Sequence, residues 1–370
     1  GVCNSDDGGK TYDACAFKGL ETCCLEHVQY SGERRGTVCF TLADHSPMIS
    51  YDNGENYSRL NGLKYTSSTA LLFPRQDTGS IFYGGYFRLS EGDGLVHETE
   101  GGIVHISNGR SQIVWESKGA YVQALKENRF RKGEYYAYID GTAEGVGGIY
   151  RSTDGGDKWT RLDFPGIAET LPVNRSFIEN ELLNIVVGQV KNVCGCNQLL
   201  ETDYFDAHTL YAGERTTGLY KSTDDGRSWI SIGRNLPFGR DTASVLMAVK
   251  QNPVQPGVLY AGFVREGLWR SADGGKSWRK IYPADGSLCN VSALYVGGKD
   301  GNEIIIGGEN LYWSDVPSTV LYSSDGGRSF IRIDDRRLGS LRIKGVDADP
   351  VSGRIFVVTS GNGAFYIDRK

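Results

Sequence analysis

Three side chains of this sequence are suited to proton transfer, and they are Tyr150, His45 and His97. Phenol and imidazole groups act as general acids and bases when a bound substrate brings a proton within hydrogen-bond reach. Tyr150 follows a glycine-rich segment at residues 144–148, where a backbone with few side chains lets a phenol point into a site. We therefore predict Tyr150 as the main acid–base residue, with His45 or His97 as the base or its partner.

A packing role for Tyr150 is the alternative. Tyr220, Trp269 and Tyr322 occupy the same place ahead of a repeated motif described below. An aromatic side chain that recurs at one place in a repeat commonly fills the core. The sequence leaves both interpretations of Tyr150 open.

Arginine and aromatic residues share the loops that carry these groups. Guanidinium groups pair with carboxylates, and aromatic rings offer flat apolar faces to sugars. This combination on an acidic protein indicates an acidic sugar as the ligand. For the two aromatics in this set, packing at the rim of the loops is an equally open interpretation. The predicted substrate-binding residues are Arg88, Arg215, Arg240, Arg265, Tyr312 and Trp313.

Two reactions fit such a site. β-Elimination at a uronate needs its carboxylate neutralised and a tyrosine or histidine as base, whereas hydrolysis of a glycosidic bond needs a pair of carboxyl groups. The many arginines and the 21 tyrosines favour elimination, and binding without catalysis is the third possibility. The carboxyl groups available for hydrolysis are Asp44, Glu144, Glu214, Asp241, Glu266 and Asp315.

A repeated motif shows which elements must position these loops. The pattern Ser-x-Asp-x-Gly-x-x-aromatic occurs six times, and a degenerate seventh copy has Asn108 in place of Asp. Each copy lies between strand-like runs, with two more such runs upstream, which makes four strands per unit. We predict an all-β fold: one domain over residues 1–370, a seven-bladed β-propeller of four-stranded antiparallel blades, closed by pairing of the N- and C-terminal strands. The complete copies begin at Ser5, Ser50, Ser152, Ser222, Ser271 and Ser323.

The aspartates of the motif are predicted to be turn residues. A short carboxylate accepts hydrogen bonds from the turn backbone, and glycine supplies the positive φ angle. These copies resemble the Asp-box (BNR) repeats of sialidases, xyloglucanases and several propeller polysaccharide lyases, and the resemblance covers the whole chain. Because the motif sits on outer turns, we expect the functional loops on the opposite face.

In size and layout the chain most resembles fungal propeller lyases that release rhamnose from glucuronate on arabinogalactan side chains, such as those of gum arabic. The resemblance implies β-elimination with Tyr150 as acid–base residue, and arginines, alone or together with Ca²⁺, holding the uronate. The runner-up is a hydrolase like the xyloglucanases. Those enzymes usually place two propellers around a cleft, and this chain has one.

Charge and apolar patterning exclude other partners. The net charge of −5 gives no basic surface for nucleic acid, and the longest apolar runs fall far short of the roughly 20 residues of a membrane-spanning helix. We expect a monomer that binds neither nucleic acid nor membranes.

Eight cysteines predict a secreted, extracellular protein with disulfides. Cys3 and Cys15 flank the first motif and are expected to pair, while a zinc site is the less favoured alternative. Three glycosylation sequons support secretion, at Asn56, Asn174 and Asn290.

Overall fold

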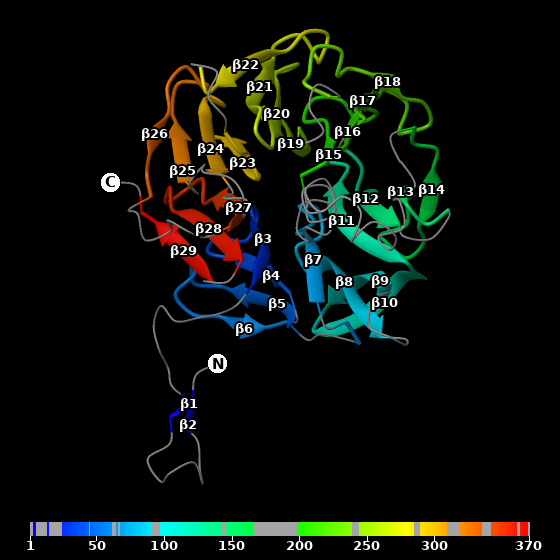
Figure 1. The fold of residues 1–370 in the computed structure, drawn as a ribbon. Coiled ribbons are helices and arrows are strands. Elements are labelled where there is room, and N and C mark those ends of the chain that lie inside the picture. The colour runs from blue at the N-terminus through cyan, green and yellow to red at the C-terminus, as the bar shows by residue number, and fades with distance from the viewer. Residues whose placement is uncertain are drawn as a thin grey trace.

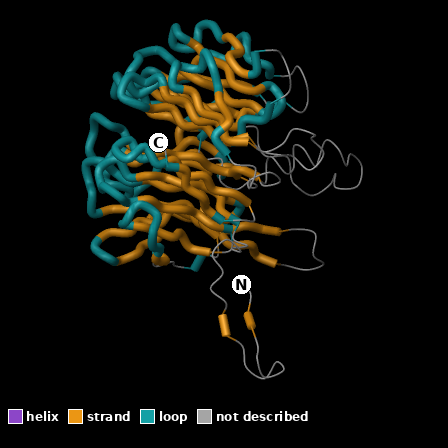
Figure 2. Tube along the Cα trace, turned by 90° about the vertical axis from the view of Figure 1, so that its left-hand side faces the viewer, coloured by secondary structure: helices purple, strands orange, loops and turns teal. Residues whose placement is uncertain are grey.

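The computed structural model describes residues 3–4, 13–14, 24–43, 45–60, 64–65, 67–90, 97–141, 145–165, 198–215, 217–238, 244–284, 289–308, 319–334, 342–360 and 363–368. These residues form antiparallel strands and contain no helix. Seven sheets stand around a central axis (Figure 1), which confirms the predicted all-β propeller with seven blades. Seen from the side, many of the described loops and turns lie at the left-hand ends of the strands (Figure 2).

Each blade runs outward from an inner strand. Blade 1 comprises β3 (Leu25–Tyr30), β4 (Val38–Leu42), β5 (His45–Ser50) and β6 (Ser58–Arg59); blade 2 comprises β7 (Ser67–Leu72), β8 (Ser80–Ser90), β9 (His97–Ser107) and β10 (Arg110–Lys118). Blade 3 comprises β11 (Ala120–Glu127), β12 (Tyr135–Gly141), β13 (Gly148–Ser152) and β14 (Thr160–Leu162); blade 4 comprises β15 (Leu200–Thr202), β16 (Leu210–Glu214), β17 (Gly218–Ser222) and β18 (Ile230–Ser231).

The remaining blades follow the same order. Blade 5 comprises β19 (Leu246–Gln251), β20 (Leu259–Phe263), β21 (Gly267–Ser271) and β22 (Arg279–Tyr282); blade 6 comprises β23 (Ala293–Gly297), β24 (Glu303–Gly308), β25 (Thr319–Ser323) and β26 (Ile331–Arg332). Blade 7 has three described strands, β27 (Arg342–Ala348), β28 (Ile355–Ser360) and β29 (Ala364–Ile367).

The repeated motif forms the turn between the third and fourth strands. In blade 5, Ser271 Oγ donates to Asp273 Oδ1 (2.7 Å) and accepts from the backbone N–H of Gly275 (2.9 Å), while the N–H of Ser277 donates to the same carboxylate oxygen (2.9 Å). The hydroxyl of Ser277, which donates to Asp273 Oδ2, lowers the pKa of Asp273 most, and together with the Ser277 N–H and the Ser271 hydroxyl it brings that pKa to about 2. The predicted turn role is therefore confirmed. The same serine–aspartate bond recurs at Ser50, Ser152, Ser222 and Ser323.

Two neighbouring glycines of this turn provide a matched test. Gly274 (φ +74°) has open space where a Cβ would stand, whereas a Cβ on Gly275 (φ +90°) would lie 2.7 Å from Ile232 Cδ1. We expect Gly274→Ala to lower the free energy of unfolding by about 1–2 kcal/mol through backbone strain alone. Gly275→Ala should cost about 1–3 kcal/mol more because of overpacking, as measured by urea denaturation. Equal losses would contradict a packing role for the motif glycine.

Side chains join the first and last blades. The backbone N–H of Tyr30 on β3 donates to Asp347 Oδ2 on β27 (2.6 Å), and Phe356 of β28 packs against Phe40 with ring centroids 6.3 Å apart. The sequence predicts that the N- and C-terminal strands pair to close the ring, and the described structure differs from this prediction. Within the described residues, β29 pairs only with β28, and β1 (Cys3–Asn4) pairs with β2 (Asp13–Ala14) in a hairpin outside the ring (Figure 1). The inner strands already meet through buried side chains, which brings the two blades together without a shared sheet.

The structure describes some of the cysteines and glycosylation sequons from which secretion was predicted, and these differ in their environment. Cys24, Cys39 and Cys289 have free thiols, whereas Cys15 lies outside the described residues and the pairing of Cys3 with Cys15 stays a prediction. Asn174 also lies outside them. Asn56 is exposed on a motif turn, but Asn290 is buried and accepts a hydrogen bond from the backbone N–H of Arg265. A buried asparagine cannot carry a glycan in the folded protein.

Candidate functional site

The face opposite the motif turns, which we call the mouth face, carries the loops between second and third strands and the loops that lead into the next blade. Arg240, Tyr312 and Trp313 of the predicted site lie outside the described residues. Arg88 and His97 lie on β8 and β9, where Arg88 is opposite Thr99 and His97 is opposite Ser90. Their side chains are outside the described part of the structure.

Five side chains meet where blades 2, 3 and 4 reach the mouth face, and we call them the mouth cluster: Tyr86, Tyr121, Asp140, Glu214 and Arg215. Arg215 directly follows β16, and its Nη2 lies 3.3 Å from Oδ2 of Asp140 near the end of β12. Tyr121 of β11 is the cross-strand neighbour of Asp140. The ring of Tyr86 lies 4.7 Å from the ring of Tyr121. A carboxylate–guanidinium pair thus adjoins an aromatic pair.

The charged members of the cluster share one buried environment. Arg215 is only 4% exposed, and Glu214 is buried with Oε2 accepting the backbone N–H of Thr217 at 2.7 Å. Burial raises the pKa of the neighbouring Tyr138; the negative charges of Asp140 and Glu214 raise it further, and the charge of Arg215 lowers it. Among these three charged groups, Arg215 and Asp140 are in direct contact at 3.3 Å.

Tyr150 has the contacts of a packing residue. It is 7% exposed, its hydroxyl donates to the backbone carbonyl of Val146 (2.8 Å), and its ring makes an edge contact with Trp115 at 5.1 Å. Burial raises the pKa of Tyr150, which disfavours the phenolate that a general base requires. Of the two interpretations that the sequence left open, this geometry favours packing.

His45 and Arg265 lie elsewhere on the mouth face. His45 is exposed at the start of β5, with Nδ1 3.2 Å from Nη2 of Arg59. The Arg265 backbone takes φ +64° in the β20–β21 turn, where its carbonyl accepts the N–H of Cys289 (3.2 Å). Of the predicted catalytic and substrate-binding residues whose side chains are described, only Arg215 belongs to the mouth cluster, together with Glu214 from the candidate carboxyl groups for hydrolysis.

Sequence reasoning missed Tyr121 and Asp140. No motif marks them, because they are far apart in sequence and become neighbours through strand register. The sequence held one signal for this pair. Residues 120–127 and 135–141 form two strand-like runs, and Tyr121 and Asp140 fall opposite each other near the ends of these runs at the mouth face.

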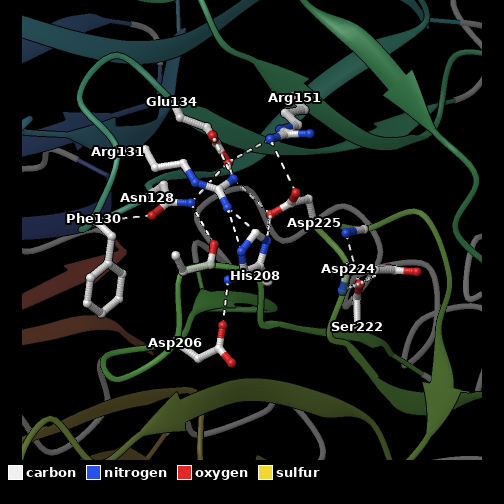
Figure 3. A network of polar contacts seen from close by, with 12 residues as sticks. Asn128, Phe130, Arg131, Glu134, Arg151, Asp206, His208, Ser222, Asp224 and Asp225 are labelled. Atoms are coloured by element: carbon white, nitrogen blue, oxygen red, sulfur yellow. Dashed lines mark hydrogen bonds and ion pairs between the residues drawn. The ribbon is translucent and has the colours of Figure 1, made fainter.

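A second polar network lies on the motif-turn face between blades 3 and 4 (Figure 3). Arg131 Nη1 contacts Glu134 Oε2 (3.2 Å) and Asp225 Oδ1 (3.0 Å), while His208 Nδ1 lies 3.0 Å from the same Asp225 oxygen. Arg151 Nη2 lies 3.1 Å from Glu134 Oε1. These charges satisfy one another across the blade interface, so the network has the character of a structural bridge.

Within the described residues, no group of three or more His, Cys, Asp or Glu side chains is arranged to hold a metal ion. The same part of the chain has no helix long and apolar enough to cross a membrane. The Ca²⁺ expected from the family resemblance stays a prediction.

Comparison with solved structures places the fold among known propellers. The chain resembles the GH74 enzyme of Niastella koreensis (TM-score 0.65, 17% identity, 95% of this chain and 53% of that chain) and the GH74 xyloglucanase of Xanthomonas campestris (TM-score 0.67, 13% identity, 94% and 53%). It also resembles YCF48 bound to D1 peptide (TM-score 0.59, 12% identity, 95% and 96%). The chain spans about half the length of the GH74 proteins. No protein-family model and no curated protein matches.

Proposed function

We propose that this chain is a secreted, carbohydrate-active propeller that binds an acidic polysaccharide at the mouth cluster and cleaves it by β-elimination. The observation that carries the proposal is the Asp140–Arg215 pair beside the aromatic pair Tyr86–Tyr121. Carboxylate and guanidinium groups bind sugar hydroxyls and carboxylates, and aromatic faces stack on sugar rings. The likeness to GH74 propellers supports a glycan as the ligand.

Different residues of the mouth cluster serve different steps of the elimination. The proton on the carbon next to the uronate carboxylate is removed, and the bond to the 4-linked oxygen breaks. That oxygen takes up a proton from water and leaves as a sugar hydroxyl, while a double bond conjugated with the carboxylate forms. We assign the base to Tyr121, because it is the cross-strand neighbour of Asp140. Arg215, oriented by Asp140 at 3.3 Å, stabilises negative charge that develops on the uronate.

Hydrolysis is the second candidate. The Asp140 carboxyl contacts Arg215, and Glu214 is the sequence neighbour of Arg215, so the mouth cluster holds the two carboxyl groups that glycoside hydrolysis requires. The GH74 likeness favours this candidate, although those enzymes are about twice as long as this chain.

One assay separates the candidates. The purified protein is incubated with glucuronate-capped arabinogalactan, and both ultraviolet absorbance and released reducing sugar are followed. We expect sugar release with a matching rise in absorbance from the conjugated double bond. Release without absorbance would replace elimination with hydrolysis. Binding without release would leave a glycan-binding propeller, and neither binding nor release would refute the proposal.

A further inference from the structure

Equivalent positions of the inner strands form a charged layer around the axis. Lys126 of β11, Glu201 of β15, Lys250 of β19 and Asp347 of β27 are each the last residue but one of their strand. The last residues of these strands lie toward the motif turns, as the pairing of Glu127 with Tyr135 and of Gln251 with Leu259 shows. We call these four residues the axial layer; it lies at the opposite end of the strands from the mouth cluster.

One carboxylate serves three cations in this layer. Glu201 Oε2 lies 3.5 Å from Lys126 Nζ and 3.8 Å from Lys250 Nζ, while Glu201 Oε1 lies 3.9 Å from Arg129 Nη2. All three separations exceed the 2.7–3.2 Å typical of N–H···O hydrogen bonds. The ammonium groups therefore keep hydrogen-bonding capacity that Glu201 does not fill.

His27 adds a buried polar atom that lacks a protein partner. It is 6% exposed, and Nδ1 has no hydrogen-bond partner within the described residues. Burial lowers the pKa of His27, and the positive charges of Lys250 and then Lys126 lower it further. An unpaired buried nitrogen costs free energy unless water or a ligand meets it.

Two ammonium groups share one carboxylate oxygen in this layer. Lys126 Nζ and Lys250 Nζ both approach Glu201 Oε2, and the same carboxylate also faces the guanidinium of Arg129. Burial lowers the pKa of Lys126 to about 8, and the charges of Lys250 and Arg129 act in the same direction against Glu201. Asp347, the second carboxylate of the layer, already accepts the backbone N–H of Tyr30 at 2.6 Å. Two positive charges therefore meet a single negative charge at Glu201 Oε2.

The two lysines also border accessible space. Their side chains are 18% and 21% exposed, whereas Glu201 between them is 2% exposed. Beyond Glu201, the guanidinium of Arg129 stacks on the Tyr204 ring at 3.6 Å. Both lysine side chains therefore keep some contact with solvent, unlike the carboxylate between them.

We propose that one small monovalent anion, of the size of chloride, binds between Lys126 and Lys250 and near His27. The anion offsets the repulsion between the two ammonium groups and accepts the hydrogen bonds that Glu201 leaves unfilled. It links the inner strands of blades 3 and 5, so bound anion stabilises the ring. This site is separate from the mouth cluster and does not depend on the proposed function.

Thermal unfolding provides the test. Sodium chloride replaces sodium gluconate at constant ionic strength, and we expect the Tm to rise by about 2 °C or more and to follow the logarithm of chloride concentration. Diffraction from crystals in sodium bromide should show an anomalous peak between the two ammonium groups. Equal Tm values in chloride and gluconate, or no peak at the axis, would overturn the proposal.

Two variants test whether the anion binds at the axial layer. Lys250→Met keeps the length of the side chain but removes the charge, and it should lose the chloride-dependent rise in Tm. The matched control is Lys276→Met, which removes a lysine of the exposed motif turn in blade 5 and should keep the full rise. If Lys250→Met does not fold, the bromide experiment on the unchanged protein still decides. A rise that survives in Lys250→Met would place the anion elsewhere.

Discussion

Tyr121→Phe lowers the rate of unsaturated-product formation by about 100- to 10,000-fold, the usual contribution of a general acid–base group. The change removes only the phenolic oxygen and keeps the ring that contacts Tyr86 at 4.7 Å. Substrate affinity should therefore change little. The measurement is the initial rate of ultraviolet absorbance on glucuronate-capped arabinogalactan, with circular dichroism to confirm the fold.

Tyr150→Phe is the matched control. Its hydroxyl donates to the Val146 carbonyl in a buried site, so its loss should lower stability slightly and leave most of the activity. The reverse result, an inactive Tyr150→Phe protein with an active Tyr121→Phe protein, would assign the acid–base role to Tyr150. If hydrolysis is the reaction, Tyr121→Phe retains activity and Asp140→Asn loses it.

Glu201→Gln lowers the free energy of unfolding by about 3 kcal/mol in a gluconate buffer at neutral pH. Removing one partner from a buried set of charges leaves the others uncompensated, and such changes typically cost about 3–5 kcal/mol. The lower figure applies because Lys126 and Lys250 retain some exposure to water. Urea denaturation measures the change.

The dependence of this loss on pH gives a second readout. The pKa of Lys126 is about 8 in the folded protein, below its ordinary value of 10.5, so the folded state releases this proton first. Stability from this group therefore rises with pH from about 8 to 10.5. We expect the loss caused by Glu201→Gln to shrink over this range, because deprotonation removes one uncompensated charge.

A surface ion pair is the control for Glu201. Glu33 Oε1 lies 2.9 Å from Arg75 Nε, a shorter distance than in any ion pair of Glu201, but these side chains are 38% and 51% exposed. Glu33→Gln should therefore cost less than 1 kcal/mol. Similar losses for both variants would show that the axial charges are solvated and uncoupled.

The repeated motif predicts most of the fold. Ser271, Asp273 and Gly275 are close in sequence, so the bonds that form their turn are local and recur in other blades. Regular spacing then implies seven blades. Closure was less predictable: Tyr30 and Asp347 are 317 positions apart, and no local pattern encodes their contact.

The candidate site shows the same division. The sequence by itself determined the repeat, the turn chemistry and the place of Arg215 on a mouth loop. Only the tertiary structure decided that Asp140 and Tyr121 accompany Arg215, and that Lys126, Lys250 and Glu201 meet at the axis. The physical reason is that a propeller brings together one position from each of several blades. Residues about 50 to 75 positions apart in the sequence then come into contact in one buried, charged environment. Sequence patterns, in contrast, indicate contacts within a single turn or hairpin.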